Sequence, residues 1–235
     1  MMKKLILSSI LGGLIIPLSG FSQKANFLTD KEKKQGWVLL FDGKSTSGWT
    51  TVNGSPVPAG WEVTNGTLSA KKGAKGGDII SAGEYADFEL MADFNISVAG
   101  NSGIKYFFTK YENGGNLGFE YQILDDKLAA DNKKANHLTG SFYDVMPPDE
   151  SQKKINAPGQ WNTMRVVAKD KKVEHWLNGI KVLSYELGSP ELKAAIAKSK
   201  FKAAPDFGDK IAGHIMLTDH SDEVAYRNLK IHPLN

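Results

Sequence analysis

One strand-like segment in the middle of the chain carries two polar side chains that can face the same way. In residues 119–126, Glu120 and Gln122 are two positions apart, so a β-strand places both on one face and Tyr121 and Ile123 on the other. That face can line a sugar-binding groove, or it can simply meet solvent as in an ordinary sandwich. Conventional glycoside hydrolysis needs two carboxylates about 5–10 Å apart, and here an amide stands at the partner position, at roughly 6.6 Å. Two-carboxylate hydrolysis therefore lacks its second carboxylate on this strand face.

Two further segments add groups that can transfer protons. His137, Tyr143 and Asp144 lie close together in a loop-like segment, and loops on a rigid scaffold often carry function. His220 follows the apolar strand 213–218, where it would share a face with Met216 and Thr218. Imidazole titrates near neutral pH, so either histidine can act as a base, an acid or a metal ligand. The alternative for both segments is a structural loop whose polar groups bond locally.

A lysine in the middle of a strand is a third kind of candidate. Asn101 lies where a turn enters a strand, and Lys105 follows it with Gly103 and Phe107 on the same face. Such a lysine is either solvated or directed at a ligand. By contrast, His175 is predicted to be structural. No cofactor is established by the sequence, although a divalent metal is compatible with four nitrogen and oxygen donors whose spacing alone does not define a site: Asp125, His137, Asp219 and His220.

The elements that must position these residues are mostly strands. The segment 88–98 alternates apolar and polar side chains, and Asn-Gly pairs at 65–66 and 178–179 are strong signals for hairpins. The one convincing helix is Pro190–Lys200, with Ser189 as its N-cap. Many short strands separated by glycine turns, without an internal repeat or linker, predict a single all-β sandwich.

Composition excludes several classes of site. The 235 residues include no cysteine, which rules out a disulfide framework, a thiolate nucleophile, a Cys-ligated metal and a lipid-modified N-terminal cysteine. The sequence also lacks a phosphate-binding glycine loop, a Gly-x-Ser-x-Gly elbow and a His-Glu-x-x-His helix. Any chemistry must come from histidine, carboxylate, lysine and tyrosine side chains gathered from several strands and loops.

The first 22 residues have the pattern of a secretory signal peptide. A basic start at Lys3 and Lys4 precedes the apolar run 5–18, which is short for a membrane span, and small residues precede the expected cleavage after Ser22. An uncleaved anchor is the alternative. Cleavage removes two lysines and lowers the formal net charge of +3 by two, so nothing points to nucleic acid. We expect a lead-in over 23–35 and one domain over 36–235, without a membrane span after cleavage, in the periplasm or secreted.

Taken together, an ordered set of motifs resembles the 3-keto-disaccharide hydrolase family. The set runs in order from about Gly36 to Pro233 and departs from the family's usual Leu-Gln-Asp-His-Gly at Thr218 and Ser221. The matching segments are Leu40–Lys44 with Gly48 and Trp49, Asn101–Tyr106, Glu120–Asp126, Gly159–Asn162, Glu174–Gly179, Gly213–Ile215 with Asp219 and His220, and Tyr226–Ile231. The resemblance implies a concanavalin A-like jelly roll that acts on an oxidised di- or oligosaccharide or glucoside. We expect an enzyme that cleaves 3-keto-glycosides, as a hydrolase or as a lyase.

The chemistry of such a substrate fits a site without paired carboxylates. A ketone at C3 acidifies the hydrogen on C2, so one base can remove it, the C1 oxygen can leave, and water can add afterwards. On this hypothesis His220 or Glu120 is the base, Lys105 or a metal stabilises the enolate, and His137 or Tyr143 is the acid. The expected substrate-binding residues are Asn101, Lys105, Gln122, Asp144 and Asp219. The alternative function is a non-catalytic carbohydrate-binding module, because the same fold supports lectins.

Overall fold

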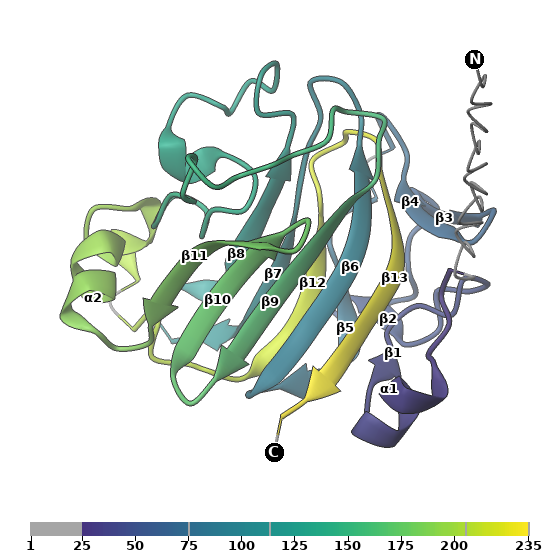
Figure 1. The fold of residues 1–235 in the computed structure, drawn as a ribbon, viewed down its shortest axis with the longest axis horizontal. Coiled ribbons are helices and arrows are strands. Elements are labelled where there is room, and N and C mark those ends of the chain that lie inside the picture. Colours follow the sequence, from purple (N-terminus) through teal and green to yellow (C-terminus); the bar gives the residue numbers. More distant parts are fainter. Residues whose placement is uncertain (1–24, 75, 113, 205, 235) are drawn as a thin grey trace, which may run out of the picture.

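The computed structural model describes residues 25–234 except 75, 113 and 205, and it contains two antiparallel sheets packed face to face. Figure 1 looks onto the larger sheet, with the smaller sheet behind it. The larger sheet has the order β11-β10-β9-β6-β13-β4-β3, with β1 also paired to β13, and the smaller has the order β2-β5-β12-β7-β8. Neighbouring strands are often distant in sequence, as in a jelly roll. The predicted all-β jelly-roll sandwich is confirmed.

The strands of the larger sheet are β1 (Val38–Leu39), β3 (Trp61–Thr64), β4 (Thr67–Ala70), β6 (Phe88–Ile96), β9 (Asn162–Lys169), β10 (Lys172–Leu177), β11 (Ile180–Glu186) and β13 (Val224–Pro233). Those of the smaller sheet are β2 (Trp49–Thr51), β5 (Ile79–Tyr85), β7 (Asn101–Tyr111), β8 (Gly115–Leu124) and β12 (Gly213–Asp219). The predicted signal peptide lies outside the described residues. Within the described part of the chain, every helix is too short or too polar to cross a membrane.

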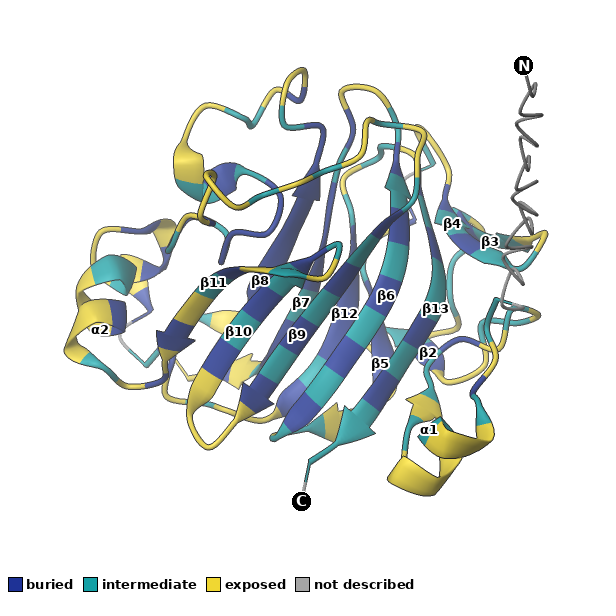
Figure 2. Ribbon diagram, viewed as in Figure 1, coloured by how far each residue is buried: buried dark blue, intermediate teal, exposed yellow. Residues whose placement is uncertain are grey.

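The core lies between the sheets and follows the predicted alternation. Along β6, every second side chain from Phe88 to Ile96 is buried, which Figure 2 shows as dark bands across the strand. Asn65 and Asn178 both have positive φ, as do the glycines after them, and they close the hairpins β3–β4 and β10–β11. Two consecutive positive-φ residues are what a two-residue type I′ hairpin turn requires, so both predicted hairpins are confirmed.

The helices differ from the expectation. Helix α2 spans Pro190–Ile196, with Ser189 as the predicted N-cap, so the prediction that it continues to Lys200 is wrong. The chain instead turns at Ser199, whose hydroxyl donates to the Ile196 carbonyl at 2.8 Å and accepts from the Phe201 N–H at 3.0 Å, and it forms the 3-10 helix η2 (Lys200–Ala203). A second short 3-10 helix, η1, spans Ala135–His137.

A helix not expected from the sequence, α1 (Asp30–Gln35), lies in the lead-in and begins with a capping box. Thr29 accepts from the Glu32 N–H, and the Glu32 carboxylate accepts from the Thr29 N–H at 2.8 Å. Upstream, Asn26 and Asn228 exchange backbone-to-side-chain hydrogen bonds of 2.7 and 2.8 Å. The described part of the lead-in is therefore bonded to strand β13.

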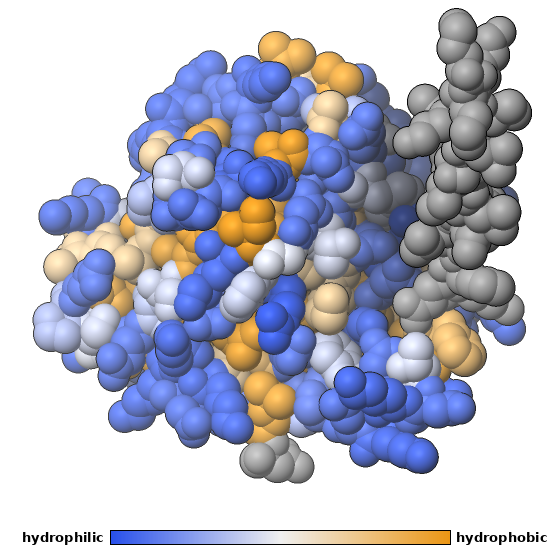
Figure 3. Space-filling view, viewed as in Figure 1, coloured by the Kyte–Doolittle hydropathy of each residue, from blue (hydrophilic) through white to orange (hydrophobic). Residues whose placement is uncertain are grey.

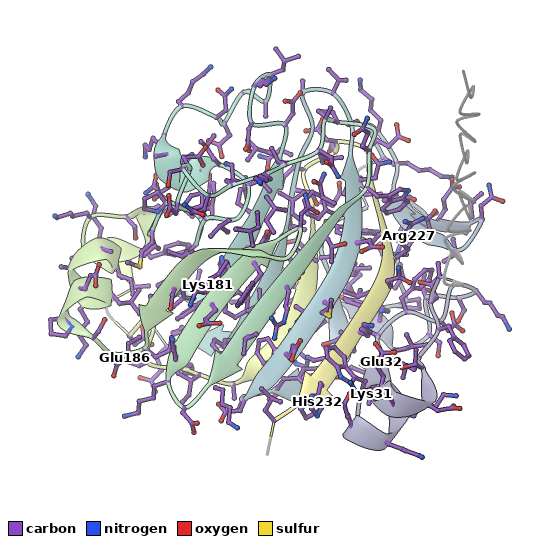
Figure 4. All side chains as sticks on the ribbon, in the orientation of Figure 1. Lys31, Glu32, Lys181, Glu186, Arg227 and His232 are labelled. Atoms are coloured by element: carbon purple, nitrogen blue, oxygen red, sulfur yellow. The ribbon has the colours of Figure 1, made fainter. Side chains whose placement is uncertain are left out.

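The outer face of the larger sheet is polar, and several of its charged side chains are paired with one another. Arg165 lies 2.6 Å from Glu89, and the Arg227 side chain lies 3.2 Å from Asp93. Lys181 lies 3.1 Å from Glu174. Figure 3 shows this face as mainly hydrophilic with small apolar patches, and Figure 4 places Lys181 and Arg227 on it. A polar face of this kind is typical of a sheet that meets solvent on its outer side.

Candidate active site

The outer face of the smaller sheet brings the predicted strand residues together. Lys105 on β7 pairs in register with Glu120 on β8 and with Met216 on β12. Side chains at paired positions on one face have Cβ atoms about 4.5–5.5 Å apart, so Lys105 and Glu120 are neighbours. One step along, Gly103 pairs with both Gln122 and Thr218. The shared face predicted for Glu120 and Gln122 is confirmed, since Tyr121 and Ile123 lie in the core.

A β-bulge changes which phenylalanine faces the site. The register of β7 shifts between Tyr106 and Thr109, and Phe107 stands at φ +52°. Phe107 consequently turns into the core, and Phe108 joins Ile80 and Met216 in a separate apolar cluster on the outer face. The prediction that Phe107 shares a face with Lys105 is therefore wrong, because strict alternation does not survive an extra residue. The outer face of the smaller sheet therefore carries this apolar cluster beside Lys105 and Glu120.

The Glu120 carboxylate is buried and without a hydrogen bond to a described residue. The residue is 4% exposed, and its Oε1 has no partner. The side chain lies over Gly103: a Cβ at that glycine would stand 2.3 Å from Oε1. Buried carboxylates are normally paired or hydrogen-bonded, because removing an ionised group from water is costly. An unsatisfied carboxylate on a sheet face is thus suited to receive a proton or a hydroxyl from a ligand.

The two amides beside Glu120 form a pair. The Gln122 Nε2 donates to the Asn101 Oδ1 at 2.9 Å, and Gln122 is 1% exposed. Thr218, at one position where the sequence departs from the family pattern, is buried and donates to the Gly103 carbonyl at 3.2 Å. These contacts fix the floor next to the carboxylate.

The loop with the second group of candidates runs along the edge of β8. The Gly140 N–H donates to the Gln122 carbonyl, and the Tyr143 N–H donates to the Glu120 carbonyl, both at 3.0 Å. Beneath it, His175 is fully buried; its Nδ1 donates to the Gly140 carbonyl at 2.9 Å and its Nε2 accepts from Tyr106 at 2.7 Å. Burial lowers the pKa of His175 to about 4, so the ring is neutral at pH 7. The structural assignment of His175 is confirmed.

His137 lies between two carboxylates. Its Nδ1 is 2.9 Å from Asp131 Oδ1, and its Nε2 is 2.8 Å from Asp144 Oδ1. Asp144 also accepts from the Lys200 N–H at 2.6 Å and from Lys134 at 3.1 Å. Burial alone would raise the pKa of Asp144, but the bonds from His137, Lys200 and Lys134 outweigh it and hold the pKa at about 2. Both ring nitrogens and both carboxylate oxygens are therefore occupied by the protein.

Tyr143 is half-buried, and its hydroxyl donates to Asp131 Oδ2 at 2.7 Å. Burial and the Asp131 carboxylate raise the pKa of Tyr143 well above its ordinary value. The hydroxyl hydrogen is thus held by Asp131, and the phenol oxygen is left as an acceptor. The catalytic assignments of His137 and Tyr143 stay predictions.

Two lysines beside Glu120 differ from Lys181 on the larger sheet, which is paired with Glu174. Within the described residues, neither Lys105 nor Lys200 makes a side-chain ion pair or hydrogen bond, and the Lys200 Nζ lies 4.1 Å from the centroid of the Tyr143 ring. Desolvation lowers the pKa of Lys200, and Lys105 lowers it further, against the opposing effect of Glu120. The residue as a whole is exposed, so this desolvation concerns the ammonium end against the ring. Sequence reasoning missed Lys200, since it ends a predicted helix and has no spacing signal.

The remaining candidates lie at the far end of β12. Asp219 accepts from the Gly77 N–H at 2.8 Å and from the Ser221 N–H at 2.7 Å, so it holds the neighbouring loops. His220 follows the strand and is exposed. Four residues separate it from Met216, which is level with Glu120, so it stands roughly 13 Å further along the strand direction. The structure does not bring His220 and Glu120 to one point.

The four proposed metal donors do not converge. Asp125 accepts from the N–H groups of Ala99, Lys127 and Leu128, and the bonds of His137 and Asp219 are given above. Over residues 25–234, with the gaps noted, no group of three or more histidine or acidic side chains is placed to hold a metal ion. Asp125, His137, Asp219 and His220 therefore do not form a metal site in the described part of the chain.

Comparisons with known proteins identify the family of the chain. A profile of the family described as 3-keto-alpha-glucoside-1,2-lyase-like domain matches residues 36–232. The chain belongs to this family. A 3-keto-disaccharide hydrolase from Bacteroides thetaiotaomicron is 31% identical over 187 residues, which cover 68% of this chain and 63% of the relative. This chain thus spans less than two thirds of that curated relative's length.

Two solved structures from Parabacteroides distasonis have folds similar to that of this chain. Both are named as candidate glycosyl hydrolases. The first has a TM-score of 0.79 and 35% identity, covering 90% of this chain and 100% of its own. The second has a TM-score of 0.65 and 27% identity, covering 84% of this chain and 99% of its own. The resemblance expected from the ordered motifs is confirmed.

Proposed function

We propose that this protein cleaves 3-keto-glycosides, by removing the proton from C2, eliminating the C1 oxygen and then adding water. The proposal rests on the Glu120 carboxylate, which is buried and whose Oε1 has no hydrogen bond to any residue that the structure describes. Membership of the 3-keto-alpha-glucoside-1,2-lyase-like family supports the substrate class. A second carboxylate is not needed, because the ketone itself makes the C2 hydrogen acidic.

The residues present support the following roles. Glu120 accepts the C2 proton, and its neighbour Lys105 stabilises the negative charge that moves to the C3 oxygen. The C1–O bond then breaks with its electron pair passing to the leaving oxygen, and a C1=C2 double bond forms. In the second half, water adds at C1 and Glu120 returns a proton to C2. Gln122 and Asn101 are proposed to bind sugar hydroxyls beside the carboxylate.

Glu120 is preferred over His220 as the base because of position. Glu120 stands level with Lys105, whereas His220 lies beyond the end of β12, four residues past Met216, the β12 residue that pairs with Lys105. Asp144 and Asp219 have both oxygens engaged by the protein, so we propose that they hold the loops of the site rather than the sugar.

The test incubates the purified protein with a pre-oxidised 3-keto-disaccharide and follows release of free sugar. Parallel reactions in D₂O follow deuterium entering C2, which elimination gives when the proton on Glu120 exchanges with solvent before it is returned, and which direct displacement does not give. We expect release together with exchange. Measurable binding without release, with and without added divalent metal, would support the non-catalytic carbohydrate-binding module instead.

We also propose that the protein acts in the periplasm or after secretion, from the predicted signal peptide at 1–22. Sequencing the N-terminus of the protein recovered from its native cell envelope checks this, and retention of Met1 in that protein would contradict cleavage.

A further inference from the structure

The proposed reaction needs a proton donor for the leaving oxygen, and the two residues expected to supply it are engaged elsewhere. Both nitrogens of His137 lie against aspartate oxygens, and the Tyr143 hydroxyl donates to Asp131. If His137 or Tyr143 gave a proton to a substrate, one of these hydrogen bonds to an aspartate would be broken. A donor whose hydrogens are free is therefore to be sought next to Glu120.

Lys200 meets this requirement by its placement. Its backbone N–H is held by Asp144, in the same loop that presents Tyr143. Its side chain then extends over the Tyr143 ring, with Nζ 4.1 Å from the centroid, and Tyr143 is itself bonded through its N–H to the Glu120 carbonyl. Contacts therefore link Glu120 to Tyr143, and Tyr143 to Lys200. The three residues come from β8, the following loop and η2.

The ammonium of Lys200 is free to act as a donor. It makes no ion pair or hydrogen bond with a described residue, unlike Lys181 on the larger sheet, which is paired with Glu174. An ammonium carries three donors, and contact with an aromatic face stabilises the cation without using any of them. Its desolvation, noted above, makes the proton easier to transfer than that of an exposed lysine.

We propose that Lys200 is the catalytic acid of the site and donates a proton to the leaving C1 oxygen. This inference rests on the proposed function. As Glu120 takes the C2 proton, the C1–O electron pair passes to oxygen, and one Nζ–H proton follows it, leaving a neutral amine. When water adds at C1, the amine accepts a proton from that water while Glu120 returns its proton to C2. Both groups are then restored.

The test compares leaving groups of different acidity. Lys200→Met should lose about 10²–10⁴-fold in kcat on a 3-keto-disaccharide, the usual effect of removing a general acid. On a 3-keto-glucoside of p-nitrophenol the loss should stay below about tenfold, because nitrophenolate leaves without a proton. A purely structural defect would lower both rates equally, and that result, or no loss on either substrate, would overturn the assignment.

Two further variants sharpen the test. Lys200→Arg keeps the charge but donates a proton poorly at neutral pH, so it should show the same selective loss; wild-type activity there would overturn proton donation. Lys202→Met, two residues along η2 at an exposed position, is the matched control and should leave both rates unchanged. Lys200→Met should still exchange deuterium into C2. A wild-type protein that neither exchanges nor turns over any 3-keto substrate would refute the proposed function itself.

Discussion

The Glu120 carboxylate is placed at an energetic cost that no hydrogen bond from the described residues offsets at Oε1. It is 4% exposed, and within the described part of the chain its Oε1 has no hydrogen bond, whereas the buried Asp144 has partners on both oxygens. Leaving a buried charged group unsatisfied typically costs at least about 1–3 kcal/mol. Such strain is commonly found where a group is kept ready for a ligand.

Replacing Glu120 separates stability from activity. Glu120→Gln should lower kcat on 3-keto-disaccharides by about 10²–10⁴-fold, because the amide cannot accept the C2 proton. The same variant should be as stable as the wild type, or more stable by up to about 2 kcal/mol, because a neutral group is cheaper to bury. Urea unfolding and initial rates measure both. Wild-type activity would mean that the wrong base has been chosen.

We predict that position 103 needs a glycine to leave room for the Glu120 carboxylate, and not to allow a special backbone conformation. A Cβ there would stand 2.3 Å from Oε1, so Gly103→Ala must displace the carboxylate. A displacement of about 1 Å in a catalytic group can cost on the order of 10²-fold in rate, and we expect a loss of that size. In the Glu120→Gln background the alanine should cost little further activity. Additive losses in this double-mutant cycle would contradict the coupling.

At the residue scale, the sequence pattern predicts the face on which a strand side chain lies wherever two-residue alternation is unbroken. The shared face of Glu120 and Gln122 follows from two-residue alternation, and the structure confirms it. Phe107 was misplaced because one extra residue in a bulge inverts the pattern, and local sequence does not mark it. Lys200 could not be found, since its meeting with Tyr143 depends on how two distant segments pack.

At the scale of elements, the loop carrying His137 and Tyr143 is held by a buried histidine on the opposite sheet. His175 on β10 bonds Gly140 from below, and Asp144 bonds the start of η2 from above. The loop is therefore fixed between the core and the segment that presents Lys200.

This arrangement predicts that the folded protein loses stability at pH values above those at which ordinary carboxylates titrate. The unfolded His175 binds a proton below about pH 6.5, and the folded residue only below about 4, because burial lowers its pKa. The unfolded state thus binds more protons in that window, and stability falls as pH drops from about 6.5 to about 4, by on the order of 3 kcal/mol. Urea midpoints across this range measure the loss.

His175→Gln is the control for that pH dependence. The amide should leave the Gly140 or Tyr106 contact incomplete and lower stability at pH 7, yet it does not titrate, so its midpoint should change less between pH 6.5 and 4. An equal pH dependence in both proteins would assign the effect to other groups.

The helices show which local signals were sufficient. Ser189 and Pro190 correctly marked the start of α2, because capping chemistry is local. Its end was overestimated, since the Ser199 cap and the Asp144 contact impose a new turn. Helix α1 carries a Thr-x-x-Glu capping box that the sequence already displays, so this element could have been predicted.

At the scale of the whole molecule, the lead-in is bonded to the sandwich rather than merely preceding it. Asn26 and Asn228 exchange hydrogen bonds, Leu28 is buried, and Glu32 pairs with Lys230. Burial alone would raise the pKa of Glu32, but Lys230 and Thr29 outweigh it and lower the pKa to about 2.

A chain that begins at Gly36 should therefore be less stable than one that begins at Lys24, by about 3 kcal/mol or more. Burial of a leucine side chain alone is worth roughly 1.5–3 kcal/mol, and the lost hydrogen bonds add to it. Urea unfolding of the two chains measures the difference. Equal stability would show that the domain begins at residue 36, as the sequence predicts.

The sequence by itself determined the sandwich, the hairpins, the common face of Glu120 and Gln122, and the resemblance to a family. Each of these depends on side-chain alternation, turn chemistry or motif order, which are encoded locally along the chain. Tertiary structure alone decided that Glu120 is left unpartnered over Gly103, that the protons of His137 and Tyr143 are held by aspartates, and that Lys200 reaches the same place. These depend on packing between segments far apart in sequence, where no local pattern records which side chains will meet.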